Sequence, residues 1–349
     1  MNPENNTAII ERLNTIAREA VSFYLPTYKN LEYIGHSDKL VYKVESSGGE
    51  YYILSVFFPK DGVDYYNDNI SLYSKQHVQA ETDLLIALSE KTDLGTSCPV
   101  KNLAGDYISY VEIDGYPSSI AVTMSSFIDG QPMNDKAEDY SKQAYAAGIA
   151  AAKLHNFSCT FSDTSSFGFP IHGKEYVRGI LSKIEHGIEA KTISKEQYNL
   201  LYDGGEKIIS YMRSLDGMKC TTKGIVHTDL RVANFIMADN CAVPVDFSRS
   251  VYGYLLYDLG EMCMHMGGSE TQRQILLGYK SVRSLSSFDL HCVQSFSVLF
   301  LMSVVAEFAL HDIPWLKNTV NGLCETQIPG ILDKGFFAPS VLELGESES

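Results

Sequence analysis

A run of polar residues between two apolar segments is the feature that most constrains the fold of this chain. The segment IVHTDLRVANFIM spans residues 225–237, and its apolar ends have the character of short buried strands. Between them lie His227, Asp229, Arg231 and Asn234. Polar groups placed next to a core must find partners, because burying them unpaired costs free energy. We therefore interpret the segment as a polar loop held rigid by two strand-like arms.

The composition indicates a folded protein with an acidic surface. The chain has 349 residues, 45% of them hydrophobic, which is enough for a large core and for two domains or lobes. Its formal net charge of -15 argues against nucleic acid as a partner, because nonspecific affinity for phosphate backbones comes from lysine and arginine. An acidic surface leaves room for a cationic substrate, although it more often only aids solubility.

Neither a secretory signal nor a membrane span is expected from the sequence. The first residues lack the charged and apolar regions of a signal peptide. The most apolar stretch, 297–310, looks too short to cross a bilayer and contains Glu307. The seven cysteines are scattered and never form a CxxC pair, which predicts reduced thiols and no zinc site. We expect a cytoplasmic protein with no membrane partner.

The hydrophobic pattern changes along the chain from strands to helices. Apolar residues at helical spacing predict a leading helix over 7–25, and the pattern of 31–58 predicts strands with a hairpin at Ser-Gly-Gly. A helix over about 71–91 precedes further strand-like pieces that end near residue 128. Later helices are expected at 140–157, 254–266 and 286–312.

This order of elements predicts an α+β fold with two lobes, a small β-rich N-terminal lobe and a larger, mainly helical C-terminal lobe. Residues 1–123 are expected to form the N-terminal lobe, with the leading helix, an antiparallel sheet and one further helix. Residues 124–132 are expected to be a connector, residues 133–345 the C-terminal lobe, and residues 346–349 a flexible tail.

The polar loop has the side chains that phosphoryl transfer requires. Asp229 and Asn234 lie five positions apart, and Asp246 follows twelve residues later between short apolar runs. Two carboxylates and an amide oxygen are hard ligands suited to Mg²⁺, and one carboxylate can orient a hydroxyl nucleophile. Protein kinases arrange a catalytic Asp, an Asn and a later metal-binding Asp in the same order.

The sequence HTDLRVANFIM, followed by VPVDFSRS and YDLGEMC, resembles the motifs of the aminoglycoside phosphotransferase and choline kinase superfamily. The enzymes of this superfamily are protein-kinase-like and phosphorylate small molecules. The resemblance covers about residues 30–270 in order. It implies a protein-kinase-like two-lobe fold and an ATP- and Mg²⁺-dependent kinase, with GTP as an alternative donor, that transfers the γ-phosphoryl group to a hydroxyl of a small molecule.

The resemblance also assigns roles within the loop. It implies that Asp229 is the catalytic residue that holds the acceptor hydroxyl and takes its proton, and that Asn234 and Asp246 are the magnesium ligands. His227 resembles the motif histidine that braces the loop. We add the hypothesis that Arg231 is catalytic as well, because an always-charged guanidinium so close to Asp229 can stabilise a transferring phosphoryl group.

A nucleotide site is expected in the N-terminal lobe and the connector. The segment 34–44 resembles the phosphate-covering hairpin of the family, although it has one glycine where three are usual. Glu81, on the apolar face of the helix over 71–91, resembles the glutamate of the kinase ion pair. The adenine should lie between the lobes against the backbone of the connector. The residues expected at this site are Gly35, Ser37, Lys43, Ser55, Glu81, Ser125 and Phe127.

Ser55 departs from the family pattern. The family carries a Lys or Arg on the strand after the glycine-containing hairpin, and alignment places Ser55 at that position. A serine can neither neutralise the α and β phosphates nor pair with Glu81, whose carboxylate needs a cationic partner. Either Lys43, on the neighbouring strand, or Lys39, in the hairpin, would have to reach the same space.

Other interpretations stay open. A catalytically impaired pseudokinase or nucleotide-binding regulatory protein would keep the fold while Ser55 removes efficient catalysis, although the complete set of Asp229, Asn234 and Asp246 favours an enzyme. A metal-dependent hydrolase built on His227 and the two aspartates lacks a second nearby histidine. Among acceptors, an aminoglycoside-like compound or other amino alcohol is favoured, while homoserine, choline, a sugar or a methylthioribose-like compound would fit the same loop.

Three further residues have expected roles outside the loop. Asp258, in YDLGEMC, is expected to cap the helix that follows it. His155 is expected to be a hydrogen-bonded core histidine and not a ligand. Trp315 and some of the 22 tyrosines are candidates for an aromatic cage around a quaternary ammonium group, although packing is the commoner role of such residues.

Overall fold

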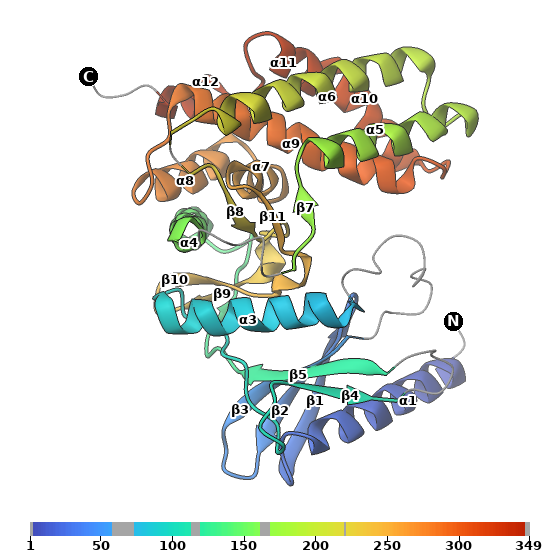
Figure 1. Cartoon of the computed structure of the whole chain (residues 1–349), viewed down its shortest axis with the longest axis vertical. Coiled ribbons are helices and arrows are strands. Elements are labelled where there is room, and N and C mark those ends of the chain that lie inside the picture. Colours follow the sequence, from blue (N-terminus) through green and yellow to red (C-terminus); the bar gives the residue numbers. More distant parts are fainter. Residues whose placement is uncertain (1–2, 58–72, 113–118, 161–167, 220, 346–349) are drawn as a thin grey trace. The chain divides into compact units, whose positions relative to one another are not determined.

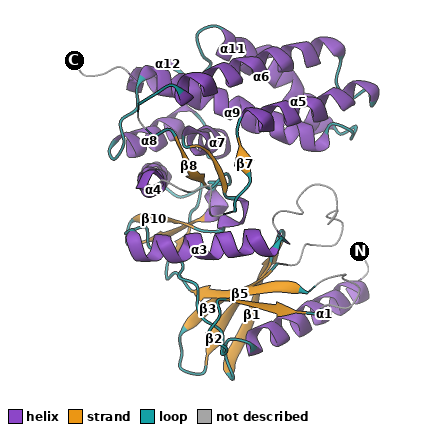
Figure 2. Ribbon diagram, in the orientation of Figure 1, coloured by secondary structure: helices purple, strands orange, loops and turns teal. Residues whose placement is uncertain are grey.

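The computed structural model describes residues 3–57, 73–112, 119–160, 168–219 and 221–345, with the side chains of 3–10 left aside. The chain divides into two compact units, Met1–Asp129 and Gly130–Ser349. An antiparallel sheet dominates the N-terminal unit and helices dominate the C-terminal unit (Figures 1 and 2). The predicted α+β class is confirmed. The predicted tail, 346–349, lies outside the described residues.

The N-terminal unit is built on a five-stranded sheet in the order β1-β2-β3-β5-β4. The strands are β1 (Tyr28–His36), β2 (Leu40–Ser46), β3 (Tyr51–Val56), β4 (Ile108–Val111) and β5 (Ile120–Ser126). Helix α1 (Pro3–Ser22) precedes the sheet, as the periodicity predicted. The predicted turn at Ser-Gly-Gly joins β2 to β3, and Gly49 adopts a φ of 97° there, which favours glycine.

The two faces of this sheet have different surroundings. Burial alternates along β2, where Leu40, Tyr42 and Val44 are buried and pack with α1 in one apolar core. The intervening residues are half-buried and lie on the other face, because successive strand residues point to opposite sides. Cross-strand pairing places Ser55 and Ser125 on that second face as well. The face away from α1 therefore carries several of the residues expected to bind nucleotide.

Helix α3 (Lys75–Lys91) packs on the second face. Its N-terminus is capped by Ser74, whose side chain accepts a hydrogen bond from the backbone N–H of His77 at 3.1 Å. Val78 packs with Phe57 and Ala121, so the side of α3 that carries Val78 faces the sheet. Glu81 lies one turn further on and is buried. The helix thus brings an acidic group to the place where β2 begins and β3 ends.

The C-terminal unit contains nine α-helices among its described residues and two small three-stranded sheets, β10-β9-β6 and β7-β11-β8. The helices are α4 (Tyr140–Thr160), α5 (Lys174–Glu189), α6 (Lys195–Asp216), α7 (Leu256–His265), α8 (Ser269–Lys280), α9 (Ser287–Phe308), α10 (Pro314–Gly322), α11 (Ile328–Leu332) and α12 (Pro339–Leu342). The strands are β6 (Gln131–Pro132), β7 (Ile171–His172), β8 (Lys223–Val226), β9 (Phe235–Ala238), β10 (Cys241–Pro244) and β11 (Val251–Tyr254). The helices predicted over 140–157, 254–266 and 286–312 are present with small differences at their ends.

Helix α9 corrects one expectation. It is 22 residues long, because Ser286 and Asp289 form a capping box that starts it well before residue 297. By length and composition the helix is apolar enough to cross a membrane, so the expectation of a stretch too short to do so was wrong. Its most apolar window is 61% buried inside the fold, and it contacts α7, α5 and α6. The helix therefore forms the core of the C-terminal unit.

Helices α4 and α8 cross at two glycines with their backbones in contact. A Cβ atom added to Gly148 would lie 2.0 Å from the carbonyl oxygen of Ile275, and one added to Gly278 would lie 1.9 Å from that of Tyr145. No side chain fits at these distances. The crossing fixes α4, which carries His155 to the centre of the unit.

We expect Gly148→Ala to lower the free energy of unfolding of the C-terminal unit by about 3 kcal/mol, because the added methyl group overpacks the crossing. Gly179→Ala is the matched control, since Gly179 lies in α5 with nothing within 4 Å of its Cβ position. That change should stabilise by about 0.5 to 1 kcal/mol. Urea denaturation monitored by circular dichroism measures both. Equal stability of the two variants would contradict the close crossing.

Candidate functional site

The polar loop lies between two strands, as its apolar ends predicted. β8 leads into it and β9 leaves it, with a short 3₁₀ turn at Val232–Asn234. β8 pairs with β11, whereas β9 pairs with β10, so each arm is anchored in a different sheet. Within the loop the backbone N–H of Arg231 donates to the carbonyl of Asp229 at 3.0 Å, and that of Asn234 donates to the carbonyl of Arg231 at 2.8 Å. The loop therefore has a fixed backbone.

Asp229 is oriented through both oxygens of its carboxylate. The side-chain amide of Asn234 donates to Asp229 Oδ2 at 2.6 Å and to the Asp229 carbonyl at 2.8 Å. Arg231 Nε lies 3.1 Å from Asp229 Oδ1, although the guanidinium side chain remains 49% exposed. Asp229 itself is half-buried. The loop thus presents a partly accessible carboxylate with a cation beside it, and the cation is the residue that we considered as a phosphoryl-stabilising group.

Asp246 lies on a second loop that is tied to the first. The loop follows β10, and Asp246 adopts a left-handed backbone with φ of 63° and accepts a hydrogen bond from Ser248 Oγ at 2.8 Å. The backbone N–H of Val245 donates to the carbonyl of Asn234 at 3.0 Å. His227, which is fully buried, donates from Nε2 to the carbonyl of Val245 at 3.0 Å. Two hydrogen bonds through one residue therefore join the two loops, and His227 makes the bracing contact that was expected of it.

Asp258 corrects a further expectation, because it does not cap its own helix. The capping position of α7 is Leu255, and the carboxylate of Asp258 instead accepts the backbone N–H groups of His227 at 3.0 Å and Thr228 at 2.9 Å. Thr228 has a φ of 55°, and a left-handed residue in such a turn lets successive N–H groups point at one anion. Asp258 is fully buried, so these bonds hold the start of the loop without competition from water.

His155 is a hydrogen-bonded core histidine, as expected. Its Nε2 donates to Asp258 Oδ2 at 3.1 Å, and its Nδ1 accepts from the hydroxyl of Tyr279 at 2.9 Å. We assign this tautomer because the carboxylate of Asp258 only accepts. All three residues are buried. A chain of side chains from α8 through α4 to α7 therefore fixes Asp258.

Sequence reasoning missed two residues that lie beside Asp229. Glu261 and His265 follow Asp258 by three and seven positions on α7, so one face of the helix carries all three. One ligand atom each from Asp229, Glu261 and His265 lie within 4.8 Å of one another. Burial raises the pKa of Glu261 well above its usual range, and the charges of Asp258 and Asp229 raise it further, whereas Arg249 and Arg231 lower it in part. The spacing of Asp, Glu and His in YDLGEMCMH is the signal that could have identified this face.

In the N-terminal unit the cationic partner of Glu81 is Lys39. Lys39 Nζ lies 3.0 Å from Glu81 Oε1, and both residues are buried. Lys43 points elsewhere, since its Nζ lies 4.4 Å from the ring centre of Tyr51 and 4.2 Å from that of Phe127. Of the two lysines considered from the sequence, only Lys39 therefore reaches the glutamate.

The position of Lys39 follows from strand register. Leu40 pairs with Val56, so the register continued by one residue places Lys39 opposite Phe57, and its Nζ lies 5.2 Å from that ring. Ser55 pairs with Val41, which follows Lys39 by two residues, or about 7 Å along the strand. Side chains alternate between the two faces of a sheet, so a separation of two residues places the Cβ atom of Lys39 on the same face as that of Ser55. The turn residue just before β2 thus supplies a lysine where β3 has a serine.

The other residues expected at the nucleotide site lie in strands or directly after them. Gly35 lies in β1, and a Cβ added there would meet nothing within 4 Å, so no described contact requires a glycine. The N–H of Ser37 donates to the carbonyl of Lys39 at 3.2 Å and helps to form the hairpin turn. Ser125 lies in β5, which continues to Ser126, and the N–H of Phe127 donates to the Tyr51 carbonyl at 3.2 Å. The start of the predicted connector is therefore strand.

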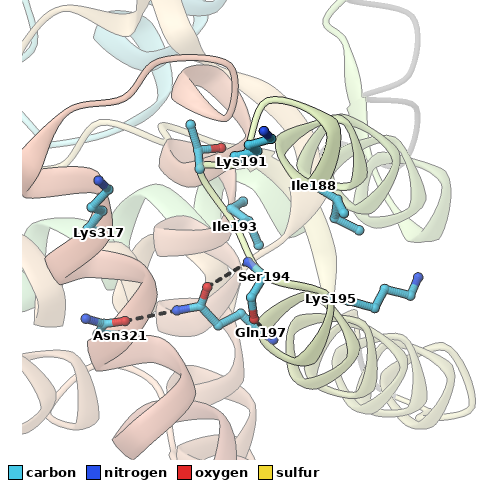
Figure 3. Close-up of a pocket in the computed structure, with 9 residues that line it drawn as sticks. Ile188, Lys191, Ile193, Ser194, Lys195, Gln197, Lys317 and Asn321 are labelled. Atoms are coloured by element: carbon cyan, nitrogen blue, oxygen red, sulfur yellow. Dashed lines mark hydrogen bonds between the residues drawn. The ribbon is translucent and has the colours of Figure 1, made fainter.

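A surface pocket of about 480 Å³ lies elsewhere in the C-terminal unit. It is formed where α5 ends, α6 begins and α10 passes (Figure 3). Gln197 spans it, accepting from the backbone N–H of Ser194 at 2.9 Å and donating to Asn321 at 2.9 Å. Its lining residues are Ile188, Lys191, Thr192, Ile193, Ser194, Lys195, Gln197, Lys317 and Asn321. None of these belongs to the polar loop, so the pocket is separate from the candidate site.

We expect Asp258→Ala to destabilise the C-terminal unit by about 3 kcal/mol, because two backbone N–H groups and His155 lose their acceptor in a buried place. The same change at Asp203, which is exposed on α6, is the control and should stay within about 0.5 kcal/mol of the parent. Chemical denaturation measures both changes. A fully stable Asp258→Ala protein would show that the carboxylate does not hold the loop.

Comparisons with known proteins identify the family. The sequence model of the phosphotransferase enzyme family matches residues 34–295. A search of curated proteins found no significant match. Similar solved structures include a microcompartment-associated aminopropanol kinase, with 20% identity, a TM-score of 0.73 and coverage of 92% of this chain and 98% of that chain. Another is the amicoumacin kinase hAmiN in complex with AMP-PNP, Ca²⁺ and Ami, with 15% identity, a TM-score of 0.68 and coverage of 95% and 97%.

A third similar structure is an aminoglycoside phosphotransferase from Alicyclobacillus acidocaldarius, with 11% identity, a TM-score of 0.58 and coverage of 90% of this chain and 93% of that chain. At these identities the likeness shows the fold, and it confirms the kinase-like two-lobe fold expected from the motifs. The family match covers most of the chain. The protein therefore belongs to the phosphotransferase enzyme family and is a small-molecule phosphotransferase with an alcohol acceptor.

Proposed function

We propose that the protein is an ATP- and Mg²⁺-dependent kinase that transfers the γ-phosphoryl group to a hydroxyl of an amino alcohol. The observation that carries this proposal is the orientation of Asp229 by Asn234 on a loop that is tied through Val245 to Asp246. A general base, a metal ligand pair and a rigid frame are what in-line phosphoryl transfer needs from a protein.

In this reaction Asp229 accepts the proton of the substrate hydroxyl. The hydroxyl oxygen forms a bond to the γ-phosphorus, and the bond from that phosphorus to the bridging oxygen breaks, so ADP leaves with the electron pair. Arg231, next to Asp229, is placed to interact with the charge of the transferred group. Its exposed side chain can leave the Asp229 carboxylate when substrate binds.

The residues present fit a magnesium ion. Asn234 uses its amide nitrogen for Asp229, which leaves its side-chain oxygen for a cation, and Asp246 contributes a carboxylate. Such all-oxygen donors suit Mg²⁺, whereas softer metals prefer sulfur or imidazole. Asn234 and Asp246 would hold the ion, and a bound Mg²⁺ neutralises phosphate charge.

Lys39 supports an enzyme over a pseudokinase. The case for impaired catalysis rested on Ser55, which cannot neutralise phosphate charge or pair with Glu81. The buried contact between Lys39 and Glu81 supplies the missing ion pair from the turn that precedes β2. We therefore assign to Lys39 the nucleotide-phosphate contact that the family makes with a lysine at the position of Ser55.

The function is tested by incubating the protein with Mg²⁺ and ATP or GTP across a panel of short amino alcohols, aminoglycosides and sugars. We expect turnover of amine-bearing alcohols, and Asp229→Asn should lower kcat by about 1,000-fold through loss of the base. Asp239→Asn is the control, because Asp239 is an exposed turn residue with a φ of 48°, a conformation that asparagine also tolerates. Stabilisation by nucleotide without turnover would favour the pseudokinase, and absence of nucleotide binding would contradict both.

The assignment of Lys39 is tested by moving the lysine. Lys39→Met should lower kcat/KM for ATP by about 100-fold, because a phosphate-binding charge is lost. The double variant Lys39→Met, Ser55→Lys should recover at least a tenth of the parent value, since both positions start on one sheet face. Lys101→Met, at an exposed lysine of the same unit, should have no effect. Full activity of Lys39→Met would contradict the assignment.

A further inference from the structure

Phosphoryl transfer leaves Glu261 without an explanation. The residue is 1% exposed, and its Oε2 has no hydrogen-bond partner among the described residues. An unsatisfied buried carboxyl destabilises a fold, and an apolar residue would pack there at no such cost. The carboxyl nevertheless lies beside Asp229, the candidate base. A costly group next to a reactive one indicates a role in binding.

His265 is the described ion-pair partner of Glu261, and the charges of Arg249 and Arg231 act on its carboxyl as well, since they lower its pKa. His265 Nε2 is 3.7 Å from Glu261 Oε1, but burial lowers the pKa of His265, with only partial compensation from the charge of Asp229. The imidazole is therefore neutral at neutral pH and supplies no full positive charge. Arg231 forms its described ion pair with Asp229 Oδ1. Burial and the charges of Asp258 and Asp229 outweigh both arginines in their effect on the Glu261 pKa, so a ligand cation would stabilise the carboxylate form.

The surroundings of Glu261 include aromatic rings. The ring of His172 stacks on Tyr176 with centres 3.6 Å apart and lies edge-on to Tyr257 at 6.3 Å. Tyr257 precedes Glu261 by four positions on α7, so the two side chains lie on one face of the helix. Burial raises the pKa of Tyr257 above its usual range, and the charges of Tyr176 and Glu261 raise it further. Aromatic faces attract cations. Trp315, the cage residue considered from the sequence, instead lies edge-on to Phe308.

Helix α7 cannot turn Glu261 away from this position. A Cβ added to Gly260 would lie 2.7 Å from the backbone nitrogen of Ser297, so α7 and α9 are in backbone contact. Ser297 Oγ also donates to the carbonyl of Gly260 at 2.8 Å. Asp258 fixes the same helix from its other neighbour, the polar loop. The separation of Glu261 from Asp229 is therefore preorganised.

We propose that Glu261 binds the ammonium group of the acceptor while Asp229 holds its hydroxyl, so that the substrate is a primary amino alcohol of two or three carbons. The carboxylate atoms concerned lie within 4.8 Å of each other. An amine and a hydroxyl on neighbouring or next-neighbouring carbons lie about 3 to 5 Å apart, which matches two groups that each donate one hydrogen bond. This inference rests on the proposed function and narrows its acceptor.

A divalent metal ion is the competing ligand of Asp229, Glu261 and His265. Such an ion would occupy the carboxylate of Asp229, which the reaction needs for the hydroxyl proton. An ammonium ion on Glu261 leaves Asp229 available. We therefore favour the ammonium group, and metal binding is one of the outcomes that the test distinguishes.

The test compares matched acceptors on the full-length protein. Ethanolamine and propanolamine should have kcat/KM values at least about 100-fold above those of ethylene glycol and propanediol, because the glycols leave Glu261 unpaired. Choline, whose quaternary nitrogen donates no hydrogen bond, should be a poorer acceptor than ethanolamine. Equal kcat/KM values for the amino alcohols and the glycols with the parent protein would overturn the proposal.

Glu261→Gln keeps the shape of the side chain and removes the carboxyl that would carry the charge opposite the ammonium group. It should raise KM for ethanolamine about 100-fold and leave kcat/KM for ethylene glycol unchanged. Its Tm should rise by about 2 to 4 °C, because a buried unpaired carboxyl is removed. Glu270→Gln, at an exposed position on α8, is the matched control and should leave KM for ethanolamine, kcat/KM for ethylene glycol and Tm unchanged. A structural role for Glu261 would instead lower Tm and affect both acceptors equally.

Calorimetric titration with ethanolamine separates this proposal from the proposed function. Binding that Glu261→Gln abolishes, in a protein with no kinase activity, would support the ammonium site and overturn the kinase assignment. Turnover with unchanged amine affinity in Glu261→Gln would overturn the ammonium site and support the kinase. Tight zinc binding that depends on Glu261 and excludes ethanolamine would overturn the ammonium site in favour of a metal.

Discussion

The hydrogen bonds from the loop backbone to Asp258 are the constraint on which the C-terminal site depends. Two consecutive N–H groups, from His227 and Thr228, point at one buried carboxylate, and Thr228 adopts a left-handed backbone to allow it. His155 Nε2 donates a hydrogen bond to the same carboxylate. The loop that follows can therefore present Asp229 in one orientation. Catalysis that depends on positioning gains from such a frame, because small displacements reduce the rate.

Helix α7 carries both the residue that fixes the loop and the residue to which we assign the acceptor amine. Asp258 fixes the first turn of α7 to the loop, and Gly260 fixes the next turn to α9. Glu261 follows Gly260 directly and lies next to Asp229. One short helix thus sets the distance between Asp229, to which we assign the hydroxyl, and Glu261, to which we assign the amine. Relatives with a different residue at the position of Glu261 would be expected to choose other acceptors.

Much of the fold and part of the site could be predicted from residue patterns. The apolar arms of the loop, the change from strands to helices and the motif spacing were sufficient for the fold class and for grouping Asp229 with Asn234. The contact of Lys39 with Glu81 depends on strand register and on the placement of α3, which no local pattern encodes. Glu261 was missed because a glutamate in a helix is usually solvated, and only tertiary packing buries it.

Direct transfer from ATP to the alcohol is the central claim, and the stereochemistry at phosphorus tests it most directly. A donor with a γ-phosphorothioate made chiral by oxygen isotopes is reacted with ethanolamine, and the configuration of the product is read by phosphorus NMR. In-line attack by a hydroxyl that Asp229 orients predicts inversion. Retention would require two displacements through a phosphorylated protein side chain, and it would contradict the assignment of Asp229 as a base acting on the substrate.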